Sequence, residues 1–145
     1  LAIEFHSFED HERGGLLLRD SADYNTFQNL LHYFDSRVPG QNDLILTLLI
    51  RLRRMGLFEK DDIRDYDLVF SMFDEDDLPE RVFQFLVEWD PTSLIRTSGR
   101  WFLFPLYWAA ARKSIREFQI VFGYGIRYYP VKKGISLLFQ KSGSG

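Results

Sequence analysis

Histidine and carboxylate side chains gather near the N-terminus, and these are residue types that bind metal ions. His6 and His11 lie five residues apart among acidic neighbours. Metal ligands on one helix are spaced three or four apart, and zinc motifs have their own fixed spacings. The stretch HERGG at 11–15 begins like the helix of a zinc protease, but the second histidine is absent. We therefore predict a solvated segment without a metal site. The acidic neighbours are Glu4, Glu9, Asp10 and Glu12.

Two acidic runs, 61–67 and 74–77, contain carboxylates that could in principle act as an acid–base pair. Such a carboxylate needs burial or a close charged neighbour to shift its pKa, whereas acidic runs in connecting segments are usually solvated. The second run also lacks the alternating ligands and central glycine of an EF-hand calcium loop. The chain has no cysteine and no Gly-x-Ser-x-Gly nucleophile motif. We predict no catalytic residues and no cofactor, and hence a protein that is not an enzyme.

The net charge of −3 conceals two oppositely charged segments. Residues 59–80 carry ten acidic and two basic side chains, a balance of −8, and residues 96–145 carry nine basic and one acidic side chain, a balance of +8. Basic residues beside aromatic ones can hold phosphates and stack bases, so a nucleic-acid or polyanion face is the alternative hypothesis. A further hypothesis is salt-sensitive self-association of the two segments. The alternative face comprises Arg116, Arg127, Lys132 and Lys133.

Positioning of these side chains depends on a repeat in the chain. The segments LIRLRRMGL (49–57), FQFLVEWDP (83–91) and FQIVFGYGI (118–126) end alike, with periods of 34 and 35 residues between Gly56, Asp90 and Gly125. A shorter apolar segment precedes each of them. Apolar residues recur three and four apart, which indicates helices. The repeating unit is therefore predicted to be a short helix, a turn, a longer helix and a connector.

The ends of the longer helices also have sequence signals. Asp77 is predicted to cap the N-terminus of the middle one, with Glu80 three residues later and a proline in the first turn. Gly56 and Gly125 are predicted to end the first and third helices, because glycine adopts the left-handed C-terminal conformation at little cost. Asp90-Pro91 is predicted to end the middle helix, since proline cannot continue the hydrogen-bond ladder.

The segment FPLYWAAARKSIREFQIVFGYGI (104–126) resembles the ankyrin repeat, Thr-Pro-Leu-His-x-Ala-Ala, a break, then Val-x-x-Leu-Leu ending in Gly-Ala. The two earlier copies match more loosely, and the whole is similar to divergent ankyrin arrays of the kind common in microalgal genomes. Phe104 replaces the usual threonine, and WFLF at 101–104 indicates an altered β-hairpin finger. The matching residues are Pro105, Leu106, Ala109 and Ala110 in the inner helix, and Phe118, Val121, Phe122 and Gly125 in the outer one.

The resemblance implies an all-α fold, a short solenoid of about three stacked helix-turn-helix units. Residues 1–23 would be an N-terminal extension or cap and 24–145 the repeat domain, with approximate units 24–60, 61–95 and 96–130 and a remnant of a further unit at 131–145. The aromatic stripe of the third unit, with Trp108, Ala109 and Ala110, is predicted to be core. An aromatic ligand box is the lesser alternative for that stripe.

The implied function is a non-catalytic scaffold that binds an unidentified protein through its inner helices and loops. The longest apolar runs are far shorter than the ~20 residues that span a bilayer, so no membrane span is predicted. The lack of cysteine favours an intracellular location, cytoplasmic or nuclear. The predicted contact residues are His32, Tyr33, Ser71, Arg100, Trp101, Tyr107 and Arg112.

Overall fold

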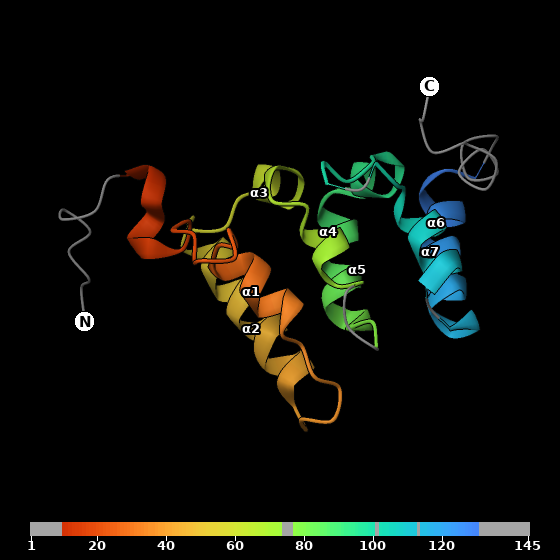
Figure 1. Ribbon diagram of the computed structural model, residues 1–145, viewed down its shortest axis with the longest axis horizontal. Helices are drawn as coiled ribbons and strands as arrows, with labels where there is room; N and C mark the ends of the chain where they lie inside the picture. The colour runs from red at the N-terminus through yellow and green to blue at the C-terminus, as the bar shows by residue number, and fades with distance from the viewer. Residues whose placement is uncertain (1–9, 74–76, 101, 113, 131–145) are drawn as a thin grey trace.

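A computed structural model describes residues 10–73, 77–100, 102–112 and 114–130, and within these ranges the chain forms helices and no strand (Figure 1). The predicted all-α class is therefore confirmed. Two 3₁₀ segments accompany the α-helices. In chain order the elements are η2 (Asp10–Gly15), α1 (Thr26–His32), α2 (Gln41–Arg54), α3 (Lys60–Asp65), α4 (Leu68–Ser71), α5 (Glu80–Trp89), η3 (Pro91–Ile95), α6 (Pro105–Arg112) and α7 (Ile115–Tyr128).

Three helix pairs follow one another along the long axis of the molecule: α1 with α2, α4 with α5, and α6 with α7 (Figure 1). In each pair a shorter helix precedes a longer one. The short helix α1 packs against α4, and the long helix α2 packs against α5. In the third pair α6 packs against α7, and η3 contacts α5, α6 and α7. The short helices thus lie on one side of the array and the long helices on the other.

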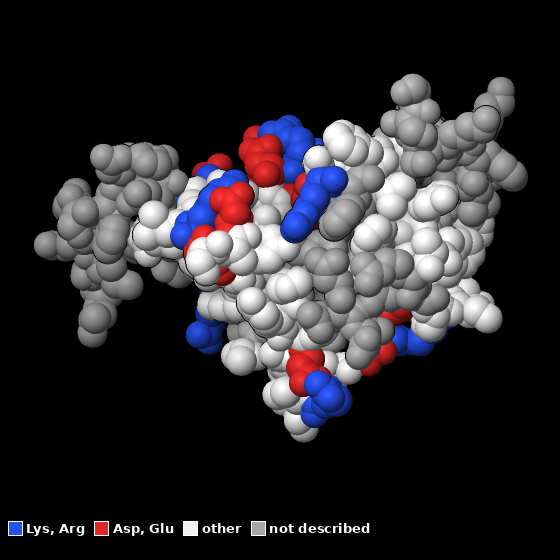
Figure 2. Space-filling view, in the orientation of Figure 1, with Lys and Arg blue, Asp and Glu red and all other residues white. Residues whose placement is uncertain are grey.

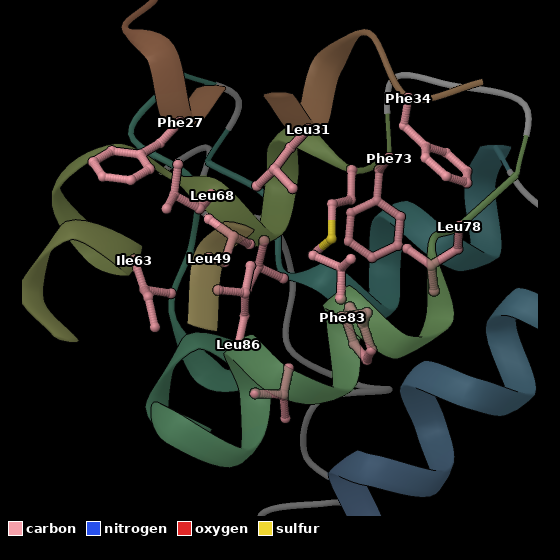
Figure 3. Packing of buried hydrophobic residues seen from close by; sticks show 14 of the residues in the cluster. Phe27, Leu31, Phe34, Leu49, Ile63, Leu68, Phe73, Leu78, Phe83 and Leu86 are labelled. Carbon is pink, nitrogen blue, oxygen red and sulfur yellow. The ribbon is translucent and has the colours of Figure 1, made fainter. Parts of the chain in front are cut away.

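Four phenylalanines are the largest fully buried side chains, and leucines pack among them in the core (Figure 3). The Phe27 ring lies 4.8 Å from that of Phe58, which meets Trp89 edge-on at 5.1 Å. Phe83 meets Tyr124 edge-on at 5.7 Å, joining α5 to α7. Such distances are the favourable range for aromatic pairs, which bury large areas. The core therefore runs without interruption from the first helix pair to the third.

The predicted core stripe of the third pair is only partly correct. Trp108, Ala109 and Val121 are buried, and the rings of Phe118 and Phe122 are half-buried and packed against the core. Ala110 is exposed. The buried side of α6 is formed by Leu106, Trp108 and Ala109, and Ala110 falls beyond its edge, on the side of the exposed Tyr107.

Two of the predicted helix ends are confirmed. The helix α2 ends at Arg54, and Gly56 then takes the left-handed conformation with φ 72°. The helix α5 ends at Trp89, just before Asp90-Pro91. Pro91 then opens the 3₁₀ turn η3, whose first residues are held by the Asp90 backbone carbonyl accepting from the Ser93 hydroxyl at 2.7 Å.

Two other predicted ends are wrong. Asp77 does not cap α5, which begins at Glu80 with Pro79 at the N-cap position, because the Asp77 carboxylate accepts a hydrogen bond from the Ser36 hydroxyl instead. Gly125 does not end α7, which continues to Tyr128. Packing outweighs the cost of about 1 kcal/mol for an interior glycine: the rings of Tyr124 and Tyr128 stack 6.5 Å apart across this turn.

The N-terminus of α1 is closed by a reciprocal pair of hydrogen bonds. Asn25 Oδ1 accepts from the Gln28 backbone N–H at 3.0 Å, and Gln28 Oε1 accepts from the Asn25 N–H at 2.9 Å. Asn25 is fully buried. These bonds satisfy two of the backbone donors that a helix start leaves without a partner.

Replacing Asn25 with alanine is expected to lower the free energy of unfolding by about 1 kcal/mol, the usual value of an N-cap side chain. Asn25→Ser keeps an acceptor at the cap and is expected to lose less. Urea unfolding monitored by circular dichroism measures both variants. Equal losses in the two would contradict the capping role.

Within the described residues, no helix is both long enough and apolar enough to cross a lipid bilayer.

Candidate binding surface

A small pocket opens on the side of the short helices and takes residues from all three helix pairs. It holds about 90 Å³. Gln28 comes from α1, Ser71 from α4 and Trp108 from α6, and Tyr24 lies in the turn just before α1. We call it the inner pocket. Its lining comprises Tyr24, Gln28, Tyr66, Asp67, Phe70, Ser71, Ser98, Arg100 and Trp108.

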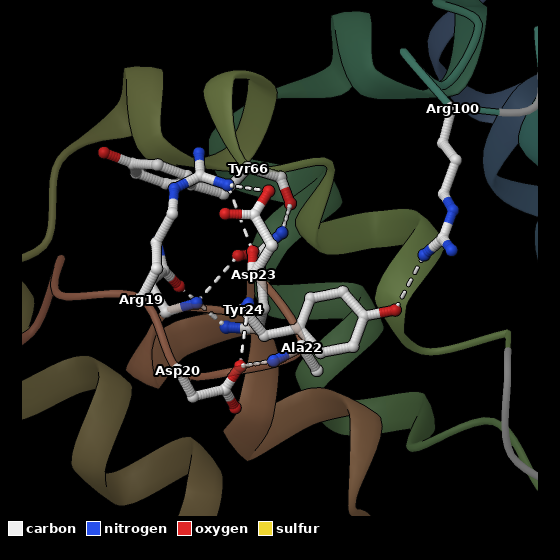
Figure 4. A network of polar contacts seen from close by, with 9 residues as sticks. Arg19, Asp20, Ala22, Asp23, Tyr24, Tyr66 and Arg100 are labelled. Carbon is white, nitrogen blue, oxygen red and sulfur yellow. Dashed lines mark hydrogen bonds and ion pairs between the residues drawn. The ribbon is translucent and has the colours of Figure 1, made fainter.

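A hydrogen bond between residues far apart in the chain closes one edge of the inner pocket. Arg100 Nη1 donates to the Tyr24 hydroxyl at 2.9 Å, across 76 residues of sequence (Figure 4). Tyr24 is held in turn by Asp20, whose Oδ1 accepts from the Tyr24 backbone N–H at 3.1 Å. Hydrogen bonding, chiefly from the Asn29 side chain, lowers the pKa of Asp20. The turn before α1 is therefore an ordered wall of the pocket.

Asp67 lines the inner pocket and has an unusual backbone conformation. Its backbone is left-handed, with φ 48° and ψ 41°, which is uncommon for a residue with a Cβ. Its Oδ2 accepts from the Gly99 N–H at 2.8 Å, which ties α4 to the loop that carries Arg100. Burial raises the pKa of Asp67, while the Gly99 hydrogen bond and the charge of Arg96 act in the opposite direction. Backbone strain and a raised pKa often coincide at functional sites.

The raised pKa of Asp67 has a consequence for stability. A carboxyl group whose pKa is higher in the folded state favours folding when it is protonated, and this contribution is lost as pH rises through the folded pKa. Asp67→Asn keeps an acceptor for Gly99 and cannot ionise. We expect this variant to gain stability relative to the wild-type protein as pH rises from the acidic range toward neutral. Urea unfolding of both proteins at several pH values tests the expectation, and a constant difference would contradict it.

A second pocket, of about 280 Å³, lies on the other side of Asp67. Its charged side chains already have partners: Arg64 bonds to Asp65 at 2.8 Å, and Arg96 pairs with the buried Asp90. The described part of the chain contains no group of three or more residues that could hold a metal ion. The pocket is lined by Ile63, Arg64, Asp65, Asp67, Val69, Phe70, Ser93, Arg96, Thr97 and Gly99.

The predicted contact residues are partly brought together. Ser71 and Arg100 both line the inner pocket. His32 lies beside it, since its ring is 5.2 Å from that of Tyr24 and 4.9 Å from that of the exposed Tyr33.

Two other predicted contact residues, Tyr107 and Arg112, belong to α6. Tyr107 is exposed on α6, next to the pocket residue Trp108. Trp101 lies outside the described residues, and Arg112 is the last residue of α6.

The inner pocket also includes three residues that the sequence did not indicate: Tyr24, Tyr66 and Asp67. The tyrosines have no pattern that separates them from core aromatics. Asp67 follows Asp65 and Tyr66 in what the sequence presents as an ordinary acidic connector, and glycine or asparagine is the usual signal for a left-handed residue. A search for aromatic residues just before each short helix would have found Tyr24.

The predicted polyanion face is largely neutralised where it is described. Arg116 pairs with Glu80 at 2.8 Å and Arg127 with Glu88 at 3.6 Å, both across to α5. Lys132 and Lys133 lie outside the described residues. On the face shown in Figure 2, basic and acidic groups mostly lie side by side near the margins. The pair between Glu80 and Arg116 joins the acidic 59–80 segment to the basic 96–145 segment within one chain.

Comparison with known proteins gives no relative: no family model, no curated protein and no solved structure matches this chain.

Proposed function

We propose that this chain is a non-catalytic protein-interaction scaffold of ankyrin-like repeats, which binds a segment of another protein over the inner pocket. The observation that carries the proposal is that a single pocket is lined by Gln28, Ser71 and Trp108, one from each helix pair. A ligand laid across this surface would touch all three pairs at once. Because these residues sit on packed helices or on hydrogen-bonded turns, little ordering would be needed on binding.

The chemistry of the lining supports a peptide ligand. Tyrosine and tryptophan offer large, rigid contact areas with a polar tip, and such residues are enriched at interfaces. The Ser71 hydroxyl donates to the Asp67 backbone carbonyl at 3.3 Å, and its oxygen can still accept a hydrogen bond from a peptide N–H. The pocket is small, so it suits one side chain of an extended partner better than a whole small molecule.

Site-specific photo-cross-linking tests the proposal. A benzophenone amino acid replaces the exposed Tyr33 or Tyr107 in the complete chain, and Arg54, exposed on the long helix α2, serves as the control position. The proteins are irradiated in a nuclease-treated lysate of the source cells. We expect a discrete cross-linked protein at the two tyrosine positions and none at Arg54. Adding Ser71→Arg, which fills the inner pocket, should weaken the cross-link.

Equal cross-linking at all three positions would overturn the proposal. Products that form in an untreated lysate but not in the nuclease-treated one would favour the polyanion alternative. That alternative has less support, because Glu80 and Glu88 compensate Arg116 and Arg127.

A further inference from the structure

The helix α2 has two opposite sides with different surroundings. One side faces α5: Asp43 pairs with Arg81, and the Arg53 guanidinium lies 4.0 Å from the centre of the Trp89 ring. The opposite side carries Leu44, Leu48 and Met55. Their spacing of four and seven residues places them in one stripe along the helix. Leu44 is 68% exposed and Met55 55% exposed. We call this stripe the leading side of α2.

The helix α7 has a matching arrangement at the other end of the array. Arg116 and Tyr124 face α5, where they meet Glu80 and Phe83. The opposite side carries Ile115, Phe118 and Phe122, spaced three and four apart. Ile115 is 78% exposed, and the two rings stack 5.8 Å apart and are half-buried. We call this stripe the trailing side of α7.

The contacts of α5 with α2 and α7 show how neighbouring long helices pack against each other in this array. The long helix α5 lies between α2 and α7 and contacts both through ion pairs and rings. Arg81 of α5 and Arg116 of α7 are 35 residues apart, which is the repeat period, and each pairs with an acidic residue on the preceding long helix. At both internal contacts, a long helix therefore uses its leading side, the side toward the preceding helix pair. That side packs against the trailing side of the preceding long helix, the side toward the following pair.

End units of repeat proteins usually present a polar outer surface, which keeps the array from continuing. The leading side of α2 and the trailing side of α7 instead carry exposed or half-exposed leucine, methionine, isoleucine and phenylalanine side chains, with the exposed Arg51 and Gln119 beside them.

We propose that the leading side of α2 in one copy of this chain packs against the trailing side of α7 in a second copy. The contact is head-to-tail, so each copy uses two different surfaces and assembly can continue beyond a dimer. The contact buries apolar side chains. Salts that are excluded from the protein surface strengthen such burial and do not screen it. This separates it from the charge-driven self-association expected from sequence, which salt would weaken.

Sedimentation velocity of the complete chain over a range of protein concentrations tests the proposal. We expect the average mass to rise with concentration at both low and high salt. Leu48→Glu removes the leading side and Ile115→Glu the trailing side, so each variant alone should remain monomeric. An equimolar mixture of the two variants keeps one intact surface on each partner. The mixture should form a dimer and stop there.

Lys60→Glu, at an exposed position of α3, is the matched control and should assemble like the wild-type protein. Circular dichroism confirms that all variants are folded. A wild-type protein that stays monomeric at every concentration would overturn the proposal. So would a mixture that shows no dimer, or Leu48→Glu copies that still assemble by themselves.

Discussion

Glu117→Ala is expected to lower the free energy of unfolding by about 3 kcal/mol, because two backbone N–H groups lose their acceptor. The Glu117 carboxylate is only 2% exposed. Its Oε1 accepts from the buried N–H of Leu78 at 2.7 Å, and its Oε2 accepts from the N–H of Ser114 at 3.2 Å. The first of these bonds crosses from α7 to the segment before α5, so the loss affects two helix pairs together.

Thermal unfolding and amide hydrogen exchange measure this effect. For a chain of this length the loss corresponds to a fall in Tm of roughly 10 °C. Glu117→Gln keeps one acceptor oxygen, so its loss should be smaller. Gln119→Ala, at an exposed position of the same helix, should change stability by less than about 0.5 kcal/mol. The Leu78 amide should exchange faster in Glu117→Ala, and an unchanged rate there would contradict the assigned hydrogen bond.

Arg13→Met is expected to have the second-largest effect, a loss of about 2–3 kcal/mol, because it leaves a buried carboxylate without its cation. Arg13 Nη1 lies 2.5 Å from Asp62 Oδ2, and the Asp62 side chain is 4% exposed. Arg13 Nη2 also meets Glu59 at 3.2 Å. These contacts fasten η2 to the start of α3. Since Arg13 itself is 17% exposed, solvent reduces the cost below that of a fully buried pair.

A double variant separates the ion pair from the rest of the site. Asp62 Oδ2 also accepts from the Glu59 N–H at 2.7 Å, and Asp62→Asn keeps an acceptor for that donor. Arg13→Met combined with Asp62→Asn should therefore be more stable than Arg13→Met alone. Arg19→Met, which breaks the exposed pair with Asp23, is the control and should cost less than about 0.5 kcal/mol. Additive losses in the double variant would show that Arg13 and Asp62 do not interact.

The sequence correctly predicted the ends of α2 and α5, where the backbone properties of one nearby residue determine where the helix stops. Gly56 ends α2 because glycine adopts the left-handed conformation, here with φ 72°, at little cost. Pro91 ends α5 because it has no N–H to donate. Long-range contacts decided the failures. Gly125 stays inside α7 because its neighbour Tyr124 packs on Phe83. Asp77 is not a cap because its carboxylate accepts a hydrogen bond from the hydroxyl of Ser36, 41 residues away.

The candidate site shows the same division. Ser71 and Arg100 were predicted because they lie on a short helix and in a loop, and the pocket contains both. Asp67 was out of reach, because its role depends on Gly99, 32 residues later in the chain. The burial of Glu117 and Asp62 could not be predicted either, since an acidic residue in a connector or first turn is ordinarily solvated.

The hydrogen bond between Tyr24 and Arg100 bears on how the chain unfolds. In an array where each unit touches only its neighbours, the two ends can fray independently and partly folded states accumulate. Here the wall before the first helix pair is joined directly to the loop before the third, bypassing the second. Opening either end must break this hydrogen bond, so local unfolding of one end removes a stabilising contact from the other. We expect denaturation in a single cooperative transition, with fluorescence and circular dichroism giving the same midpoint.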